Sequence, residues 1–355
     1  MPSEAEDCKQ GRAGSSNSRP SRRAVTALIA GALAFKTSPL SAKAPALPVN
    51  IDIQSRSITA FDPREPSRRK FGQLRFRGGL ILTSAFPQFG GISAIRVGAD
   101  GAQFIALSDH GWWLKGRIRY EGERPAGISD AIMAPILGPD GQPLADHGWY
   151  DTESIAEDGG TLYVGIERVN QIVRFDYGRD GLMARGYPIA VPPSVRSLPR
   201  NQSLEALVFV PRGQPLGGTL IVLSERGLDR LGNLRAFLLG GPSPGAFTVK
   251  RTGTFDITDA ALLPSGDLLI LERSFSWTKG LFVRIRRAAI NDVKPGAVVD
   301  GLILLEADLA YEIDNMEGLS VHRASDGATV LTLISDDNFS ILQRTLLLQF
   351  ALEEA

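Results

Sequence analysis

The chain has 355 residues, of which 43% are apolar and 22% charged, and this composition is typical of a globular protein with one large domain or two ordinary ones. Its 38 glycines and 22 prolines favour many turns over long helices. The formal net charge is zero and the tryptophans do not lie in a basic stripe, which argues against a nucleic-acid partner. The single cysteine, Cys8, excludes an internal disulfide.

Residues 1–44 are predicted to be an export signal and disordered tail. Arg22 and Arg23 precede an apolar run, Ala24 to Phe35, that is too short to span a bilayer but suits a signal peptide. The paired arginines indicate twin-arginine export, while an ordinary secretory signal or a basic disordered tail stays open. We therefore expect a periplasmic or secreted monomer, with no membrane segment after cleavage and with access to calcium.

A repeat occupies the rest of the chain, residues 45–355. Five stretches beginning at Gly90, Asp151, Ser203, Ile257 and Asn315 share one pattern: a polar lead residue, a short apolar strand, a glycine turn, a second apolar strand and an acid. The lead residues are Ser93, Glu153, Glu205, Asp259 and Glu317, spaced by about 55 residues, a period that fits the blade of a β-propeller.

The sequence therefore predicts an all-β fold, a single β-propeller of four-stranded antiparallel blades. Residues 50–92 and 317–355 remain beyond the full periods and hold roughly two blades of chain, so we expect six blades, with five as the alternative. The segment near residue 55 and the C-terminal strand are expected to close the ring.

The acids of the repeat are expected to meet at one mouth of the central channel. In an antiparallel hairpin the start of the first strand and the end of the second lie at the same edge. The strand-end acids are Asp109, Glu167, Glu225, Glu272 and the pair Asp336 and Asp337.

Many like charges need a counter-charge, and clustered carboxylates without cysteine suit calcium. The predicted calcium ligands are Glu153, Glu205, Asp259, Glu317, Asp109, Asp336 and Asp337. The alternative is that these acids form structural latches between blades, paired with the arginines that follow some of them.

Departures from the repeat suggest a binding cleft at the same mouth. The stretches SDHGWW and ERSFSWTKG bring aromatic and basic residues to strand ends, and DHGW recurs before Asp151. The predicted catalytic or phosphate-contacting residues are His110, His147 and Lys279, and the predicted substrate-binding residues are Arg168, Arg226, Arg273, Trp112 and Trp277. The alternative is that DHGW is a turn whose tryptophan packs over a blade edge. The GPSPG stretch is no serine-esterase site, because Pro244 lacks the oxyanion-hole N–H.

The twin-arginine-like leader, the strand starts ESIA, LEAL and MEGLSV and the strand ends ER and SDD resemble the phytase-like family. This resemblance covers about residues 50–350 and implies a propeller with esterase-like activity. Together with the acids it favours a metal-dependent hydrolase whose partner is a small-molecule ester or phosphate ester. The alternatives are a non-catalytic envelope propeller that binds a ligand or protein and holds a structural calcium ion, and a lactonase-like propeller with a single metal.

Overall fold

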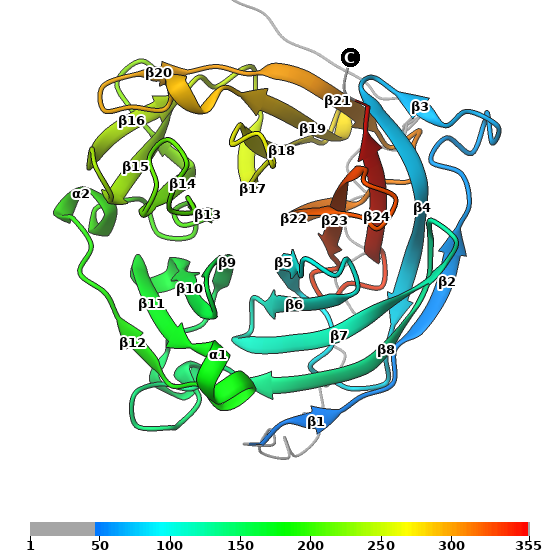
Figure 1. Ribbon diagram of the computed structural model, residues 1–355, viewed down its shortest axis with the longest axis horizontal. Coiled ribbons are helices and arrows are strands. Elements are labelled where there is room, and N and C mark those ends of the chain that lie inside the picture. The colour runs from blue at the N-terminus through cyan, green and yellow to red at the C-terminus, as the bar shows by residue number, and fades with distance from the viewer. Residues whose placement is uncertain (1–46, 354–355) are drawn as a thin grey trace, which may run out of the picture. The chain divides into compact units, whose positions relative to one another are not determined.

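The computed structural model describes residues 47–353, in which five β-sheets surround a central axis (Figure 1). The predicted export signal lies outside the described residues. In Figure 1 the strands nearest the axis are β5 (Ile92–Val97), β9 (Thr152–Asp158), β13 (Ala206–Phe209), β17 (Asp256–Leu262) and β22 (Asn315–Arg323). Each of these inner strands contacts the inner strands of both neighbouring blades, so the ring is closed. The predicted all-β propeller is therefore confirmed.

Blades 1 to 4 follow one another along the chain, and each runs outward from its inner strand. Blade 1 continues through β6 (Gln103–Ser108), β7 (Trp112–Glu121), β8 (Arg124–Pro135) and β1 (Val49–Asn50), and blade 2 through β10 (Thr161–Ile166), β11 (Gln171–Asp176) and β12 (Gly186–Pro188). Blade 3 has β14 (Thr219–Leu228), β15 (Leu234–Gly240), β16 (Gly245–Val249) and the parallel β20 (Val298–Val299). Blade 4 has β18 (Leu268–Ser276), β19 (Gly280–Ala288) and β21 (Leu302–Asp308).

Blade 5 is built from both ends of the described chain. Its order is β22, β23 (Thr329–Asp336), β24 (Thr345–Leu352), β4 (Leu74–Thr83) and β2 (Gln54–Ile58), with β3 (Lys70–Phe71) paired to β4. The antiparallel pairing of Leu82 with Thr345 closes the ring. The expectation of six blades is therefore wrong and the propeller has five, because the N-terminal and C-terminal segments interleave in one sheet instead of forming two.

The helices are short and lie in connections between strands. They are η1 (Leu144–His147), η2 (Glu167–Val169), α1 (Tyr177–Asp180), η3 (Gly181–Met183), α2 (Pro193–Arg196) and η4 (Ile290–Asp292). Among residues 47–353, no helix is both long and apolar enough to cross a bilayer.

The hydrophobic core is divided into five clusters, one between each pair of adjacent blades. Both faces of a blade are therefore covered, and strands near the axis are apolar on both sides instead of alternating. In β23 and β24 every residue is buried. This packing holds the inner strands rigidly and fixes the side chains at their ends, where the candidate site lies.

Candidate functional site

A β-bulge near the start of the inner strand defines one position in four of the five blades. The residues without a cross-strand partner there are Ser93, Glu153, Thr258 and Glu317. In blade 3, Glu205 precedes the pair Ala206–Leu223, just as Glu153 precedes the pair Ser154–Gly165. A bulge re-aims the side chain that it carries. These five residues therefore occupy equivalent positions at one end of the propeller, which we call the mouth.

The second strand of each blade supplies another equivalent position at the mouth. The register of the hairpins places Asp109, Glu167, Glu225, Arg273 and Asp336 at this position. Four of the five are acids, and blade 4 alone carries a base. Blade 4 therefore breaks the symmetry of the mouth by replacing a negative charge with a positive one.

Two predicted members of the ring lie one residue away from these positions. Asp259 follows the bulge residue Thr258, and Glu272 precedes Arg273 in the strand. Because a shift of one residue turns a strand side chain to the opposite face, neither carboxylate joins the others. Glu272 instead pairs with Arg284 at 2.8 Å and with Arg286, between β18 and β19.

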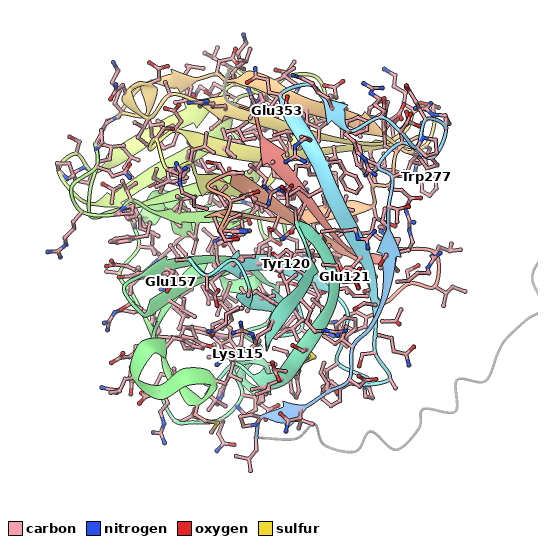
Figure 2. The ribbon with its side chains drawn as sticks, turned by 45° about the vertical axis from the view of Figure 1, so that its right-hand side comes forward. Lys115, Tyr120, Glu121, Glu157, Trp277 and Glu353 are labelled. Carbon is pink, nitrogen blue, oxygen red and sulfur yellow. The ribbon has the colours of Figure 1, made fainter. Side chains whose placement is uncertain are left out.

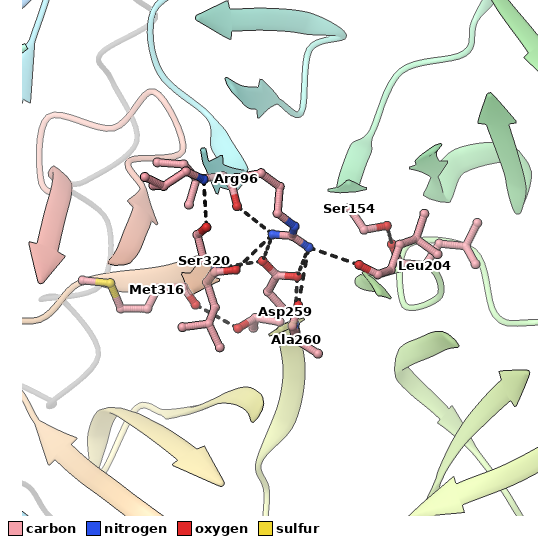
Figure 3. Close-up of polar contacts among 12 residues, drawn as sticks. Arg96, Ser154, Leu204, Asp259, Ala260, Met316 and Ser320 are labelled. Atoms are coloured by element: carbon pink, nitrogen blue, oxygen red, sulfur yellow. Dashed lines mark hydrogen bonds and ion pairs between the residues drawn. The ribbon is translucent and has the colours of Figure 1, made fainter. Parts of the chain in front are cut away.

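Asp259 takes part in an ion pair close to the propeller axis (Figure 3). Its carboxylate receives two hydrogen bonds from Arg96, at 2.8 and 3.1 Å, and a third from the backbone N–H of Leu319 at 2.8 Å. Arg96 belongs to β5 and Asp259 to β17, so the pair joins inner strands of blades 1 and 4. The structure thus places this predicted calcium ligand against an arginine.

Five glutamates gather at the mouth, and we call Glu153, Glu167, Glu205, Glu225 and Glu317 the mouth carboxylates. Glu167, Glu205 and Glu225 each offer an oxygen within 4.8 Å of the other two. Glu205 is only 8% exposed, and Glu167 and Glu317 are also buried. Glu167 and Glu225 were predicted as strand-end acids but not as metal ligands, because the sequence does not show which of the acids lie close together in the fold.

Burial raises the pKa of every mouth carboxylate, and repulsion from neighbouring acids adds to most of these shifts. The pKa of Glu317 rises to about 8 and that of Glu167 to about 7, chiefly because burial disfavours the charged form. The pKa values of Glu153 and Glu205 rise well above their usual range for the same reason. Near neutral pH these groups therefore either hold protons or need a cation.

Within the described chain, the ion pairs of the mouth carboxylates come from Arg273. Its guanidinium lies 2.8 Å from Glu317 and 3.6 Å from Glu225, and it also bonds to the amide oxygen of Asn315. Asn315 in turn donates a hydrogen bond of 2.8 Å to Glu317. One arginine cannot neutralise five charged glutamates, so the remaining charge must be offset by bound protons, by cations or by both.

A second acidic group lies beside the first, at the junction of blades 1 and 5. Burial raises the pKa of Asp336 to about 7 and that of Asp109 to about 6, and the two carboxylates repel each other. Asp337 accepts hydrogen bonds from Gly91 N–H at 3.0 Å and from the Thr345 hydroxyl at 3.0 Å. Asp337 therefore also fixes the loop that joins β23 to β24.

The predicted histidines lie in different surroundings. His110 stacks on Phe339 with ring centroids 4.3 Å apart, and its Nε2 lies 4.0 Å from Asp109, so it belongs to the mouth. His147 Nε2 lies 2.9 Å from Asp140, in a pocket that includes Trp149 and residues of the outer strands β11 and β12. The structure therefore brings only His110 to the acids.

The remaining predicted binding residues divide between the core, the surface and one groove. Trp112 is buried against Phe86, and the guanidinium of Arg168 lies over the ring of Tyr150 at 4.4 Å. Lys279 is exposed in the turn between β18 and β19. The three predicted residues that line a common groove, of about 1030 Å³, are Arg226, Arg273 and Trp277.

The fold and the mouth together define the class of the protein: a five-bladed β-propeller with a carboxylate cluster at one end of its axis. The model of the phytase-like family, described as "Esterase-like activity of phytase", matches residues 87–339. The chain belongs to this family, and the resemblance noted from its motifs is confirmed.

Comparisons with individual proteins give distant matches. No curated protein matches the sequence. Among solved structures, glutaminyl cyclase from Myxococcus xanthus is 11% identical, with 87% of this chain and 100% of that chain covered and a TM-score of 0.40. The WD40 repeats of RRP9 are 11% identical, with 84% and 100% covered and a TM-score of 0.35. The structure of U3-55K is 11% identical, with 73% and 95% covered and a TM-score of 0.36.

Proposed function

We propose that this protein is an exported, calcium-dependent hydrolase of an ester or phosphate ester, with its reaction centre at the mouth carboxylates. The observation that carries the proposal is the convergence of Glu167, Glu205 and Glu225 within 4.8 Å of one another. Membership of a family described by its esterase-like activity supports the choice of reaction.

The chemistry of the mouth fits calcium better than a softer metal. Its donors are carboxylate oxygens, which calcium prefers, whereas zinc and copper favour nitrogen and sulfur. Because burial raises the pKa of Glu167 and Glu205, a bound dication would release protons and stabilise the charged carboxylates. When bound, such an ion would polarise the ester oxygen and lower the pKa of a coordinated water.

The protein's own groups supply positioning and proton transfer in this proposal. Glu153 is one of the mouth carboxylates, and burial raises its pKa, so near neutral pH it can hold a proton and donate it to the leaving group of the ester. His110, beside Asp109, can carry protons between the mouth and solvent. Arg273 contacts two mouth carboxylates and also lines the adjacent groove, where it can hold a negatively charged substrate group.

The second candidate function is a non-catalytic binding propeller in which these positions hold blades together. Several contacts favour it. The Ser93 hydroxyl donates to the Thr152 carbonyl of the next blade at 2.6 Å, and Thr258 donates likewise to Met316 at 2.9 Å. Arg273 also connects Glu225 of blade 3 to Glu317 of blade 5.

Hydrolysis and melting measured on the same samples separate the two functions. The full-length chain is treated with EDTA and assayed on nitrophenyl phosphate and short nitrophenyl esters, with and without calcium. We compare Glu205→Gln with Glu157→Gln, which removes an exposed acid near the end of β9 that lies away from the mouth.

Calcium-dependent turnover in the wild type and Glu157→Gln, lost in Glu205→Gln, supports the hydrolase. Turnover that changes neither with calcium nor with Glu205→Gln would place the reaction outside the mouth carboxylates. Absence of turnover, with a melting temperature that calcium still raises, would leave the binding propeller.

A further inference from the structure

A groove of about 1030 Å³ lies beside the mouth carboxylates, over blades 4 and 5 and the edge of blade 3. Arg273 and Asn315 belong both to its lining and to the contacts of Glu317. The groove and the carboxylate cluster therefore share a border. Its size is at the upper end of the range for small-molecule sites.

One end of the groove carries an excess of positive charge. Arg226 and Arg251 share a single carboxylate, that of Asp256, with Arg226 Nε at 2.9 Å and Arg251 at 2.6 Å. Arg273 lies at the border with the mouth, where its charge is already paired with Glu317 and Glu225. Arg226 is partly exposed and bonds to Asp256 through Nε and Nη2, so its Nη1 group can donate to a bound anion while the pair with Asp256 stays in place.

The other end is apolar and unusually exposed. Trp277 is 94% exposed and Leu342 is 87% exposed, and both line the groove together with Leu309. Figure 2 labels Trp277 at the right-hand edge of the molecule. Phe275 packs edge-on against Trp277 with ring centroids 5.4 Å apart, so the two rings form one wall. Clustered exposed apolar side chains of this size mark binding surfaces.

We propose that this groove binds an anionic amphiphile: an ester whose one anionic group lies on Arg226 and Arg251, and whose aryl or acyl part lies on Trp277. The inference rests on the proposed hydrolase, for which it names the substrate class. A single anionic group matches the one positive charge of Arg226 and Arg251 that Asp256 does not neutralise, whereas the further charges of a polyanion would lie near the mouth carboxylates and be repelled. Phosphate and carboxylate share this recognition chemistry.

Binding of non-hydrolysable probes tests the groove independently of turnover. Calorimetric titrations of the full-length chain in EDTA use 2-naphthylmethylphosphonate and 2-naphthylacetate, which carry both features. Methylphosphonate lacks the apolar part, and 2-naphthylmethanol lacks the charge. EDTA removes any contribution from a metal at the mouth carboxylates.

Two pairs of variants identify the residues that bind the probes. Trp277→Ser is matched by Leu231→Ser, which removes an 83% exposed leucine outside the groove lining. Arg226→Gln is matched by Arg287→Gln, which removes an arginine paired with Asp267 at 2.7 Å outside the groove lining. We expect about tenfold weaker binding of the naphthyl probes in each groove variant and little change in each control.

The inference is overturned if Trp277→Ser binds the naphthyl probes as the wild type does, or if either single-feature probe binds as tightly as they do. The tighter of the two naphthyl anions identifies the preferred anionic group. Probe binding that follows the expected pattern without ester hydrolysis would retain the groove and reject the hydrolase. Calcium-dependent hydrolysis with probe binding unaffected by both groove variants would do the reverse.

Discussion

Replacing Arg96 by methionine should destabilise the whole propeller, because this side chain ties several blades together at the axis. Its guanidinium bonds to both carboxylate oxygens of Asp259. It also donates to the carbonyls of Leu207 at 3.1 Å and Leu319 at 3.0 Å, in the inner strands of blades 3 and 5. Methionine fills similar space but provides none of these donors.

The expected loss follows from what the substitution leaves behind. Asp259 is 0% exposed, and without Arg96 its carboxylate keeps only the backbone N–H groups of Ala260 and Leu319 as donors among the described residues. Removing one partner of a buried ion pair typically costs about 3–5 kcal/mol. We expect the free energy of unfolding to fall by about that amount.

Urea denaturation of four proteins measures this loss: wild type, Arg96→Met, Asp259→Asn and the double variant. The double variant should lose much less than the sum of the single losses, because it leaves no unpaired buried charge. Arg117→Met is the control, since Arg117 is a surface residue 3.7 Å from Asp100 and should change stability by less than about 1 kcal/mol. A loss below about 1 kcal/mol for Arg96→Met, at an unchanged m-value, would refute the reasoning.

The remaining predictions concern pH, a second buried acid and the packing of the inner strands. Metal-free protein should lose stability as the pH rises from about 5 to about 8, because burial raises the pKa of Glu167 to about 7 and that of Glu317 to about 8. At a pH between the pKa of these glutamates in the unfolded chain and their pKa in the folded state, the folded state holds protons that the unfolded chain has released. A melting temperature in EDTA that is constant or rises with pH would contradict this prediction. Glu272→Gln should lower the free energy of unfolding by about 3–5 kcal/mol, since Glu272 pairs with arginines away from the mouth. It should keep the rise in melting temperature that the proposed calcium binding predicts; loss of that rise in a folded variant would place Glu272 at the proposed calcium site. Gly318→Ala should lower the free energy of unfolding in urea by about 1–3 kcal/mol, because the added Cβ would lie 3.0 Å from the backbone nitrogen of Ile95 in the next blade. An unchanged free energy of unfolding would show that the inner strands can move apart.

The sequence predicts the propeller correctly because the pattern that indicates a blade lies within a short stretch of chain. Glycine turns and paired apolar strands recur at a nearly constant period, and each hairpin is formed by neighbouring residues. The number of blades depends on a different kind of fact, the pairing of β4 with β24 across the whole described chain. Counting leftover residues cannot reveal that two segments share one sheet.

The sequence predicts that the candidate site is a cluster of carboxylates, but it does not predict correctly which residues form the cluster. The acids Glu153, Glu205 and Glu317 recur in the motif itself and lie together at the mouth. In blade 4, Asp259 and Glu272 are each displaced by one residue from the positions of the other acids, because the sequence does not show that the bulge residue is Thr258. The partner of Asp259, Arg96, lies 163 residues earlier in the chain, and no local pattern in the sequence links the two residues.

The closure of blade 5 has a consequence for the order of folding. Strand β4 is made before blades 1 to 4, whereas its partner β24 is made after them, so β4 presents an unpaired edge until β24 has been synthesised. Contacts so distant in sequence form slowly, and the exposed edge invites pairing with other chains in the meantime. A circular permutant that begins between blades 1 and 2 would make the strands of blade 5 in one stretch of chain, interrupted only by the short strand β1. We expect this permutant to refold faster and to aggregate less than the natural order.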